Sequence, residues 1–316
     1  METYYVGDCE GLEKMRENPE SEFILTDDIN MNNKNWKPVS RFGGILDGNG
    51  HSIKNLRIEI SEGEDNECGF IRCFSSRSDE IDSVVRDISF QNALVKVENG
   101  LDCGVVMGRN SDAKISNCNV KNSEIKGNAH RMGGIVGRNK KRDCLIQNCV
   151  SENLVVINID ESIPSRVGGI VGENWSDTIN SKVSKSVIKG AFMTGGLLGS
   201  MFVGTNIYNC SSHCIVKSSK VAGGLVGVME GSGRGHGPNK IEDTYFVGEV
   251  EASASGVMVG ELRGKSIIEN SHWVSEESAR IGNFLEASHY ENSVINNSRE
   301  VESQEKAKKA VISGKI

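Results

Sequence analysis

The sequence predicts an all-β protein that folds as a parallel β-helix, a solenoid in which each turn of the chain stacks on the turn before it. Two patterns lead to this prediction: a glycine-flanked segment occurs six times, and an Asn or Asp residue recurs roughly every 31 residues. The composition agrees with it. With 36 Gly and only 4 Pro in 316 residues, the chain is neither a collagen helix nor a disordered linker, because both are rich in proline.

The six glycine segments align without gaps, and in each one a first and a last Gly enclose apolar residues. They span residues 104–108, 133–137, 168–172, 195–199, 223–227 and 256–260. Between them, stretches such as 183–188 alternate in polarity with the period of a β-strand. Glycine weakens a helix by about 1 kcal/mol but suits sharp corners between short strands, which argues against a helical repeat. Propeller blades need about 40–45 residues and more aromatic residues than the 5% present.

The second pattern is a column of Asn and Asp residues, each following a short apolar strand. Its members are Asn55, Asp87, Asn117, Asn148, Asn180, Asn209, Asp243 and Asn270. In a parallel stack, like positions lie above one another at a spacing of about 4.8 Å. Asn side chains in such a column hydrogen-bond along the stack and satisfy backbone groups at a bend. We therefore expect about eight coils and a rod roughly 35–40 Å long.

The residue after the column Asn becomes small in the later coils and includes Cys118, Cys149 and Cys210. We expect these thiols inside the solenoid, because free Cys behaves as a small hydrophobic residue. Neighbours Cys118 and Cys149 are within disulfide range, whereas Cys210 is two coils beyond Cys149. Since the chain has 9 Cys, at least one thiol stays unpaired in any disulfide scheme.

A metal site is the alternative explanation for these side chains. Cys144 with Cys149, or Cys210 with His213 and Cys214, lacks the CxxC spacing of a zinc site. A ladder of mostly neutral Asn supplies too few carboxylates for strong calcium binding. We expect no metal and no cofactor.

The ends of the chain differ from the repeat. Residues 1–40 are expected to form an N-terminal cap with a short helix over residues 9–18 and an incoming strand, because an uncovered solenoid end exposes a strand edge. Residues 41–275 are assigned to the β-helix, with repeats of roughly 31 residues. Residues 276–316 are polar and are expected to form a C-terminal cap and tail.

The units of sequence Gly-Gly-(Leu/Ile)-Val-Gly-x-Asn, clearest at residues 133–139 and 168–174, resemble the GLUG motif of bacterial repeat proteins. Residues 9–18 and the stretch FGGILDGNGHSIKNL at residues 42–56 look like the start of the same proteins. The resemblance covers about residues 4–275. It implies a right-handed β-helix, in line with the hand of parallel crossovers. It also implies adhesin-like surface proteins or proteins associated with polysaccharide handling, with no catalytic residue in the repeat.

Charge and hydropathy limit the partners and the compartment. A net charge of −7 gives no basic face for nucleic acid, and no apolar run approaches the roughly 20 residues that cross a bilayer. The first residues, METYYVGDCEGLEKM, lack the apolar stretch of a secretory signal. The resemblance indicates the cell surface, whereas the missing signal and the odd cysteine count indicate the cytoplasm. Both compartments stay open, as does the oligomeric state.

Three places offer side chains for binding. Loops between coils are the usual binding regions of such rods, and the longest Gly-rich loop, residues 229–238, holds Arg234 and His236. A basic turn suited to an acidic glycan or a phosphate contains Arg138, Lys140, Lys141 and Arg142. Trp175 follows a repeat Asn and is equally suited to stacking on a sugar or to burial under a loop.

Three functions remain open. We expect a non-enzymatic binding, adhesion or scaffold module that recognises a glycan or a protein through its loops. The alternative is a polysaccharide lyase or glycoside hydrolase on the same fold, since Gly-His-Gly also occurs in polygalacturonase-type β-helix enzymes. Such an enzyme needs two positioned acids, and the pair Asp27 and Asp28 is far along the chain from His236. A third alternative is a cytoplasmic or phage-borne structural protein.

Overall fold

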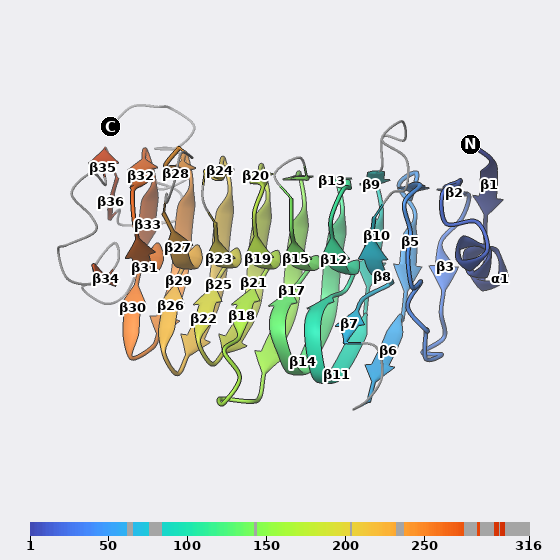
Figure 1. Cartoon of the computed structure of the whole chain (residues 1–316), viewed down its shortest axis with the longest axis horizontal. Coiled ribbons are helices and arrows are strands. Elements are labelled where there is room, and N and C mark those ends of the chain that lie inside the picture. Colours follow the sequence, from blue (N-terminus) through green and yellow to red (C-terminus); the bar gives the residue numbers. More distant parts are fainter. Residues whose placement is uncertain are drawn as a thin grey trace.

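The computed structural model describes residues 1–61, 66–75, 84–141, 144–202, 204–231, 237–274, 283–284, 294–296 and 298–300. Over these residues the chain is a nearly all-β parallel solenoid, and Figure 1 shows an elongated rod with successive coils side by side. The predicted fold class is therefore confirmed. The coil count differs slightly, because the solenoid makes about six turns instead of about eight, while sheet A alone is longer and has eleven described strands. The expected number also counted Asn55 and Asp87, which precede the first glycine segment.

Sheet A is built from strands of three or four residues in which the central residue points into the core. Leu46, Ile115 and Ile207 are examples, each fully buried, while the residues beside them are partly exposed. In order along the rod, the described strands of sheet A are β1 (Thr3–Val6), β2 (Glu22–Leu25), β4 (Ile45–Asp47), β9 (Val84–Arg86), β13 (Lys114–Ser116), β16 (Leu145–Gln147), β20 (Asp177–Ile179), β24 (Asn206–Tyr208), β28 (Asn239–Glu242), β32 (Ser266–Glu269) and β35 (Val294–Asn296).

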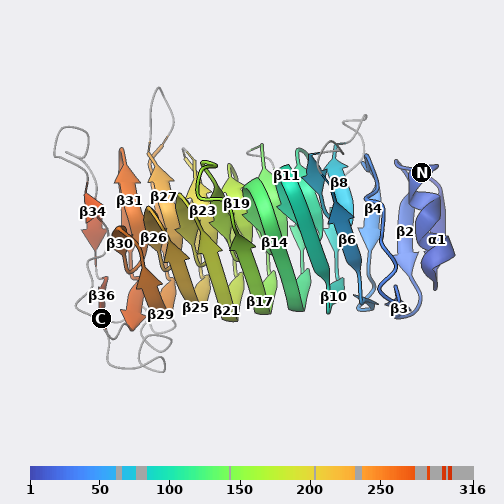
Figure 2. The ribbon, with the colours of Figure 1, turned by 90° about the horizontal axis from the view of Figure 1, so that it is seen from below.

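Sheet B contains the longest strands, which Figure 2 shows along one side of the rod. Their alternating burial matches the period-two pattern of the sequence. The described strands, in chain order, are β3 (Ile29–Asn30), β5 (Ser52–Lys54), β6 (Arg57–Ile60), β7 (Glu67–Cys68), β10 (Ser89–Gln91), β11 (Leu94–Gly104), β14 (Asn119–Gly133), β17 (Val150–Asn158), β18 (Arg166–Gly168), β21 (Lys182–Gly190), β22 (Met193–Gly195), β25 (Ser211–Ser218), β26 (Val221–Gly223), β29 (Tyr245–Glu251), β30 (Ala254–Gly256), β33 (His272–Val274) and β36 (Arg299–Glu300).

Sheet C follows each glycine corner. Its described strands are β8 (Ile71–Phe74), β12 (Met107–Asn110), β15 (Val136–Asn139), β19 (Val171–Asn174), β23 (Leu198–Met201), β27 (Val226–Glu230), β31 (Val259–Arg263) and β34 (Asn283–Phe284). Neighbouring strands pair in parallel, so that Asn139 lies beside Asn174 and Asn110 beside Asn139.

The glycine segments form the corners between sheets B and C because backbone approaches backbone there. A Cβ atom on Gly133 would lie 2.0 Å from the carbonyl oxygen of Val136, and one on Gly137 would lie 2.2 Å from the amide nitrogen of Cys103. Neither glycine is among those with positive φ. Glycine is thus needed at these corners because no side chain fits, and an unusual backbone conformation is not the cause.

The Asn and Asp column stands at the corner between sheets A and B. Its eight members have φ between 47° and 56°, a left-handed conformation that Asn and Asp tolerate best among non-glycine residues. Asn117 donates its side-chain amide to Asp87 Oδ1 at 2.7 Å, and Asn209 donates to Asn180 Oδ1 at 2.8 Å. The predicted hydrogen bonding along the stack is confirmed.

A second Asn ladder runs inside the solenoid and consists of Asn110, Asn139 and Asn174, all fully buried. Asn110 donates to Asn139 Oδ1 at 2.9 Å, and Asn139 donates to Asn174 Oδ1 at 3.0 Å. These bonds satisfy amides that would otherwise be unpaired in the core.

The cysteines are free thiols, and all except Cys9 are buried. Cys118, Cys149 and Cys210 lie in the interior as predicted, with exposures of at most 1%. Ser181 occupies the intervening position, where its hydroxyl accepts from the Cys149 amide at 3.2 Å and its own amide donates to Cys210 Sγ at 3.3 Å. Burial raises the pKa of the Cys210 thiol to about 12.

The predicted N-terminal helical cap is confirmed. Helix α1 (Cys9–Glu13) continues as a 3₁₀ turn, η1 (Lys14–Arg16), and Figure 2 shows α1 covering the end of the rod beside β2. Asp8 caps the helix by accepting from the Gly11 amide at 2.8 Å, and Leu12 and Met15 are fully buried. Most of the expected C-terminal cap and tail, residues 276–316, lies outside the described residues. In the described part of the chain, no helix is long and apolar enough to span a membrane.

Candidate functional site

The outward-facing side chains at the end of each sheet A strand form one continuous column along the rod. The strand register places in this outer column Tyr5, Ile24, Asp47, Arg86, Ser116, Gln147, Ile179, Tyr208, Glu242 and Glu269. Because each coil adds one side chain at a spacing of about 4.8 Å, the column presents a regular row of groups to a ligand lying along the rod.

Two exposed aromatic side chains belong to this outer column. Tyr5 is 74% exposed and Tyr208 is 43% exposed. They are separated by seven strand spacings, or about 34 Å. Exposed aromatic rings offer a flat apolar face and, in tyrosine, a hydroxyl group for hydrogen bonding.

A hollow of about 320 Å³ lies around Tyr208 and is lined by Asp177, Asn206, Lys240 and Glu242, among others. Asn206 donates both its backbone amide and its side-chain amide to Asp177 Oδ1, at 2.8 and 3.1 Å. The ammonium group of Lys240 lies 2.9 Å from carboxylate oxygens of Glu242 and Glu269. These contacts fix donors and acceptors beside an exposed ring.

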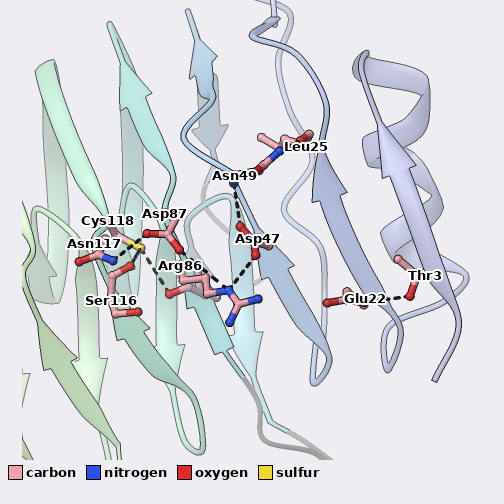
Figure 3. Close-up of polar contacts among 11 residues, drawn as sticks. Thr3, Glu22, Leu25, Asp47, Asn49, Arg86, Asp87, Ser116, Asn117 and Cys118 are labelled. Atoms are coloured by element: carbon pink, nitrogen blue, oxygen red, sulfur yellow. Dashed lines mark hydrogen bonds and ion pairs between the residues drawn. The ribbon is translucent and has the colours of Figure 1, made fainter.

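A larger hollow, of about 500 Å³, lies at the corner between sheets A and B and is lined by Asp47, Arg86 and Asp87 among others. Figure 3 shows the polar contacts of these three side chains. Nε of Arg86 lies 2.8 Å from Asp47 Oδ2 and 3.9 Å from Asp87 Oδ2. Each carboxylate also accepts a hydrogen bond from an Asn residue. The Asn49 backbone amide donates to Asp47 at 2.7 Å, and the Asn117 side-chain amide donates to Asp87 at 2.7 Å. The lining is therefore polar and already ordered by its own hydrogen bonds.

The charges in this hollow favour binding over proton transfer. The hydrogen bond with Asp47 is the main cause that raises the pKa of Arg86, so the guanidinium stays protonated and is not a base. The same guanidinium donates to Asp47 and lies 3.9 Å from Asp87. Carboxylates held in this way accept hydrogen bonds from ligand hydroxyl groups.

Two of the sequence-predicted binding residues, Arg138 and Trp175, meet on sheet C at a residue that the sequence analysis missed. Nε of Arg138 lies 2.8 Å from Oε1 of Glu173, and the indole N–H of Trp175 donates to the same oxygen at 3.0 Å. The Trp175 ring also stacks on Phe202, with ring centroids 4.3 Å apart. Trp175 is therefore partly buried against protein partners.

The other predicted binding residues lie elsewhere or outside the described residues. Lys140 and Lys141 are exposed just after β15, and Lys141 pairs with Asp112. Arg142, Arg234 and His236 fall outside the described residues.

Several side chains that the sequence analysis missed stand at fixed offsets from the glycine segments or the Asn column. Asp102, Arg131 and Arg166 each precede the first Gly of a glycine segment by two residues. Glu173 follows the last Gly directly, at the same offset as Arg138, which the sequence had already indicated. Equal offsets place side chains in one column of a solenoid, so charged residues at these offsets indicate a charged cluster. In the outer column, Tyr208 has such a signal as well, since it directly precedes Asn209 of the Asn column.

The described residues contain no group of three or more His, Cys, Asp or Glu side chains arranged to hold a metal ion. No family model matches the chain, and no curated protein does. The resemblance to GLUG-motif proteins thus stays a prediction.

The chain is similar in structure to a protein from Bacteroides ovatus described as a "putative immunoglobulin A1 protease". The two superpose with a TM-score of 0.58 over 99% of this chain and 87% of the other, and their sequences are 17% identical. At this identity the likeness shows a shared fold alone.

Proposed function

We propose that the protein is a non-enzymatic glycan-binding scaffold and that a linear polysaccharide lies along the outer column of sheet A. The observation that carries this proposal is the placement of Tyr5 and Tyr208, the two exposed aromatic residues in the described part of the chain, in one column of a regular rod. The C–H faces of pyranose rings pack on exposed tyrosine rings, and hydroxyl groups bond to the polar side chains between them.

The chemistry of the outer column suits a hydroxyl-rich polymer. Between the tyrosines, Ile24 and Ile179 each lie beside one ring, and Asp47, Arg86, Ser116 and Gln147 offer acceptors and donors in the coils between them. The coil spacing of about 4.8 Å is similar to the length of one hexose unit, so successive sugars meet successive coils. A repeating ligand therefore fits a repeating surface.

The alternative of a polysaccharide lyase or glycoside hydrolase is less well supported. Glycoside hydrolysis needs one carboxylic acid and one carboxylate facing the scissile bond. The carboxylates of Asp47 and Asp87 share Arg86 instead, and Asp102 and Glu173 are only 2% exposed. The resemblance to adhesin-like GLUG proteins, which carry no catalytic residue in the repeat, agrees with binding alone.

The test is calorimetric titration of the protein with a panel of neutral and acidic polysaccharides, with an assay for new reducing ends on the same mixtures. We expect binding to at least one polysaccharide without cleavage. Tyr208→Ala should weaken that binding about tenfold, through loss of roughly 1.4 kcal/mol of ring contact. Ile159→Ala is the matched control, because Ile159 is also exposed, at 56%, but follows β17 on sheet B. Equal affinities of the Tyr208→Ala variant and the wild type would contradict the proposal.

A further inference from the structure

Sheets B and C form a concave angle whose floor is the row of motif glycines. Gly137 approaches the backbone of Cys103 and Gly172 approaches that of Met132, so the two sheets nearly touch along this line. Just beyond the floor, Arg131 and Arg166 stand on sheet B and Arg138 and Glu173 stand on sheet C. We call Asp102, Arg131, Arg138, Arg166 and Glu173 the charged cluster.

Glu173 is the centre of the charged cluster. Arg131 donates from Nε to Glu173 Oε2 at 2.6 Å and from Nη1 to Asp102 Oδ1 at 2.9 Å. Nε of Arg138 lies 2.8 Å from Glu173 Oε1, and Nε of Arg166 lies 3.4 Å from Oε2. Three guanidinium groups therefore surround a carboxylate that is itself only 2% exposed.

The charged cluster has one more positive than negative charge, since three arginines face Asp102 and Glu173. Arg166 is the least well compensated of the three, because its Nε lies 3.4 Å from Glu173, farther than the Nε atoms of Arg131 and Arg138. In the described structure the buried Nε atoms of Arg166 and Arg138 make no hydrogen bond. Burial, followed by repulsion from Arg131 and Arg138, lowers the pKa of Arg166 in spite of the attraction of Glu173. A guanidinium is costly to bury unless it is paired, so an anion at this place would be stabilising.

The acidic groups around the charged cluster are in contact with other arginines. Glu67 contacts Arg109 at 2.6 Å. Glu230, which also attracts Arg166, contacts Arg263 at 2.8 Å, and Arg263 is shared with Glu261. The ion-pair partner of Arg166 is Glu173, at 3.4 Å.

The charged cluster is accessible to a small group from outside. The side chains of Arg138 and Arg166 keep 23% and 24% of their surface exposed. Next to them, the stacked rings of Trp175 and Phe202 form a wall, and the guanidinium carbon of Arg166 lies 5.9 Å from the Phe202 ring centroid. Arginines beside an aromatic wall are suited to a planar oxyanion attached to a ring.

We propose that the charged cluster is a binding site for a carboxylate, of the kind carried by a uronic acid, and that Arg166 supplies the least well paired positive charge. The carboxylate lies between Arg138 and Arg166 and its sugar ring rests against Trp175. This site is on sheets B and C, and it does not depend on the glycan site proposed for sheet A.

The proposal is tested by titrating the full chain with galacturonate, tri-galacturonate, sulfate and neutral galactose at constant ionic strength. The variants are Arg166→Gln, Arg166→Lys and Lys189→Gln, the last of which removes one exposed charge from sheet B. We expect the wild type to bind galacturonate and its trimer and not galactose. The affinity should fall at least tenfold in Arg166→Gln, partly recover in Arg166→Lys and be unchanged in Lys189→Gln.

Thermal unfolding is the control for folding. Without Arg166, the charged cluster has two arginines and two carboxylates. The Arg166→Gln variant should therefore have a melting temperature no lower than that of the wild type, although its affinity for the anion is lost. The proposal is overturned if Arg166→Gln binds galacturonate as tightly as the wild type, if the wild type binds none of the anions, or if Arg166→Gln melts well below both Arg166→Lys and the wild type. Tighter binding of sulfate than of galacturonate would also overturn it, because the proposed ligand is a carboxylate. Unchanged galacturonate binding in the Tyr208→Ala variant would show that this binding is independent of the glycan site proposed on sheet A.

Discussion

Tyr5 and Tyr208 occupy the same outer column of sheet A, one on β1 and the other on β24, about 34 Å apart. Nothing in their sequence surroundings is alike, since Tyr5 belongs to the cap region and Tyr208 to a regular coil. Only the parallel register brings them into line. A shared line makes a single extended ligand possible for both.

The first prediction concerns this pair. If one polysaccharide chain contacts both rings, Tyr5→Ala should weaken binding of a long chain but leave binding of a short oligosaccharide at Tyr208 unchanged. The expected loss for the long chain is about tenfold. Calorimetry on the Tyr5→Ala, Tyr208→Ala and double variants measures it. An equal loss for short and long ligands would mean that the two rings do not share one chain.

The second prediction concerns the glycine corners. Gly137→Ala would place a Cβ atom 2.2 Å from the amide nitrogen of Cys103, so the backbone of two coils must move. We expect the free energy of unfolding to fall by about 1–3 kcal/mol. Urea titration measures this loss. In Gly237→Ala, where an added Cβ has no atom within 4 Å, the change should be small; a similar loss in both variants would contradict the close-packing explanation.

The third prediction concerns the buried Asn ladder. Asn139→Ala removes the oxygen that accepts a hydrogen bond from Asn110 and the amide that donates one to Asn174. The position is fully buried. We expect a loss of about 1–3 kcal/mol, because buried polar groups are left unpaired. The exposed Lys126→Ala on β14 serves as the reference in the same urea titration. If Asn139→Ala is as stable as this reference, the ladder does not stabilise the core.

The fourth prediction concerns acid. Burial acts to raise the pKa of Glu173, but hydrogen bonds from Arg131 and Trp175 outweigh it, and the pKa is lowered overall. A lowered pKa gives stability that is present above the ordinary glutamate pKa and is lost as the pH falls through the lowered value. The pKa of Asp102 shifts in the opposite direction, because burial raises it by more than the attraction of Arg131 lowers it.

The stability difference between the wild type and Glu173→Gln should therefore be large at pH 7 and shrink as the pH falls below about 4. Urea titrations at a series of pH values measure it. Glu98→Gln, at an exposed position of β11, should show little difference at any pH. A Glu173→Gln difference that is constant from pH 7 to pH 3 would contradict the assigned ion pairs.

The fifth prediction concerns the thiols. Eight of the nine cysteines are buried, and burial raises the pKa of Cys210 and Cys214 to about 12, so thiolate is scarce at neutral pH. In the native protein, a thiol reagent should react with Cys9 at most; after unfolding in guanidinium it should react with all nine. Rapid reaction of several thiols in the native state would show that the interior cysteines are accessible.

The fold was predictable because its determinants repeat. The left-handed backbone of the column favours Asn or Asp at one position of each coil, and the tight corners require Gly at another. Such periodic signals are visible in a single sequence. The buried ladder of Asn110, Asn139 and Asn174 was visible only in part, because the same column continues as Met201 and Met229. A column that changes from polar to apolar side chains gives no constant signal.

The candidate sites were less predictable because their residues come from different coils. Arg131 reaches Asp102 and Glu173, which are 29 and 42 residues away, and only the register of the strands shows that these side chains meet. Arg138 and Trp175 were identified as separate candidates, one for its charge and one for its ring. Their shared partner, Glu173, is an unremarkable acidic residue in the sequence.

The measurement that tests the central claim most directly is the dependence of affinity on ligand length. Oligosaccharides of the best-binding polysaccharide, from two sugars upward, are titrated into the wild-type protein. If the glycan lies along the outer column from Tyr208 to Tyr5, the affinity should keep rising until the chain spans about 34 Å, or seven coil spacings, and then level off. An affinity that is already maximal with two or three sugars would contradict binding along sheet A.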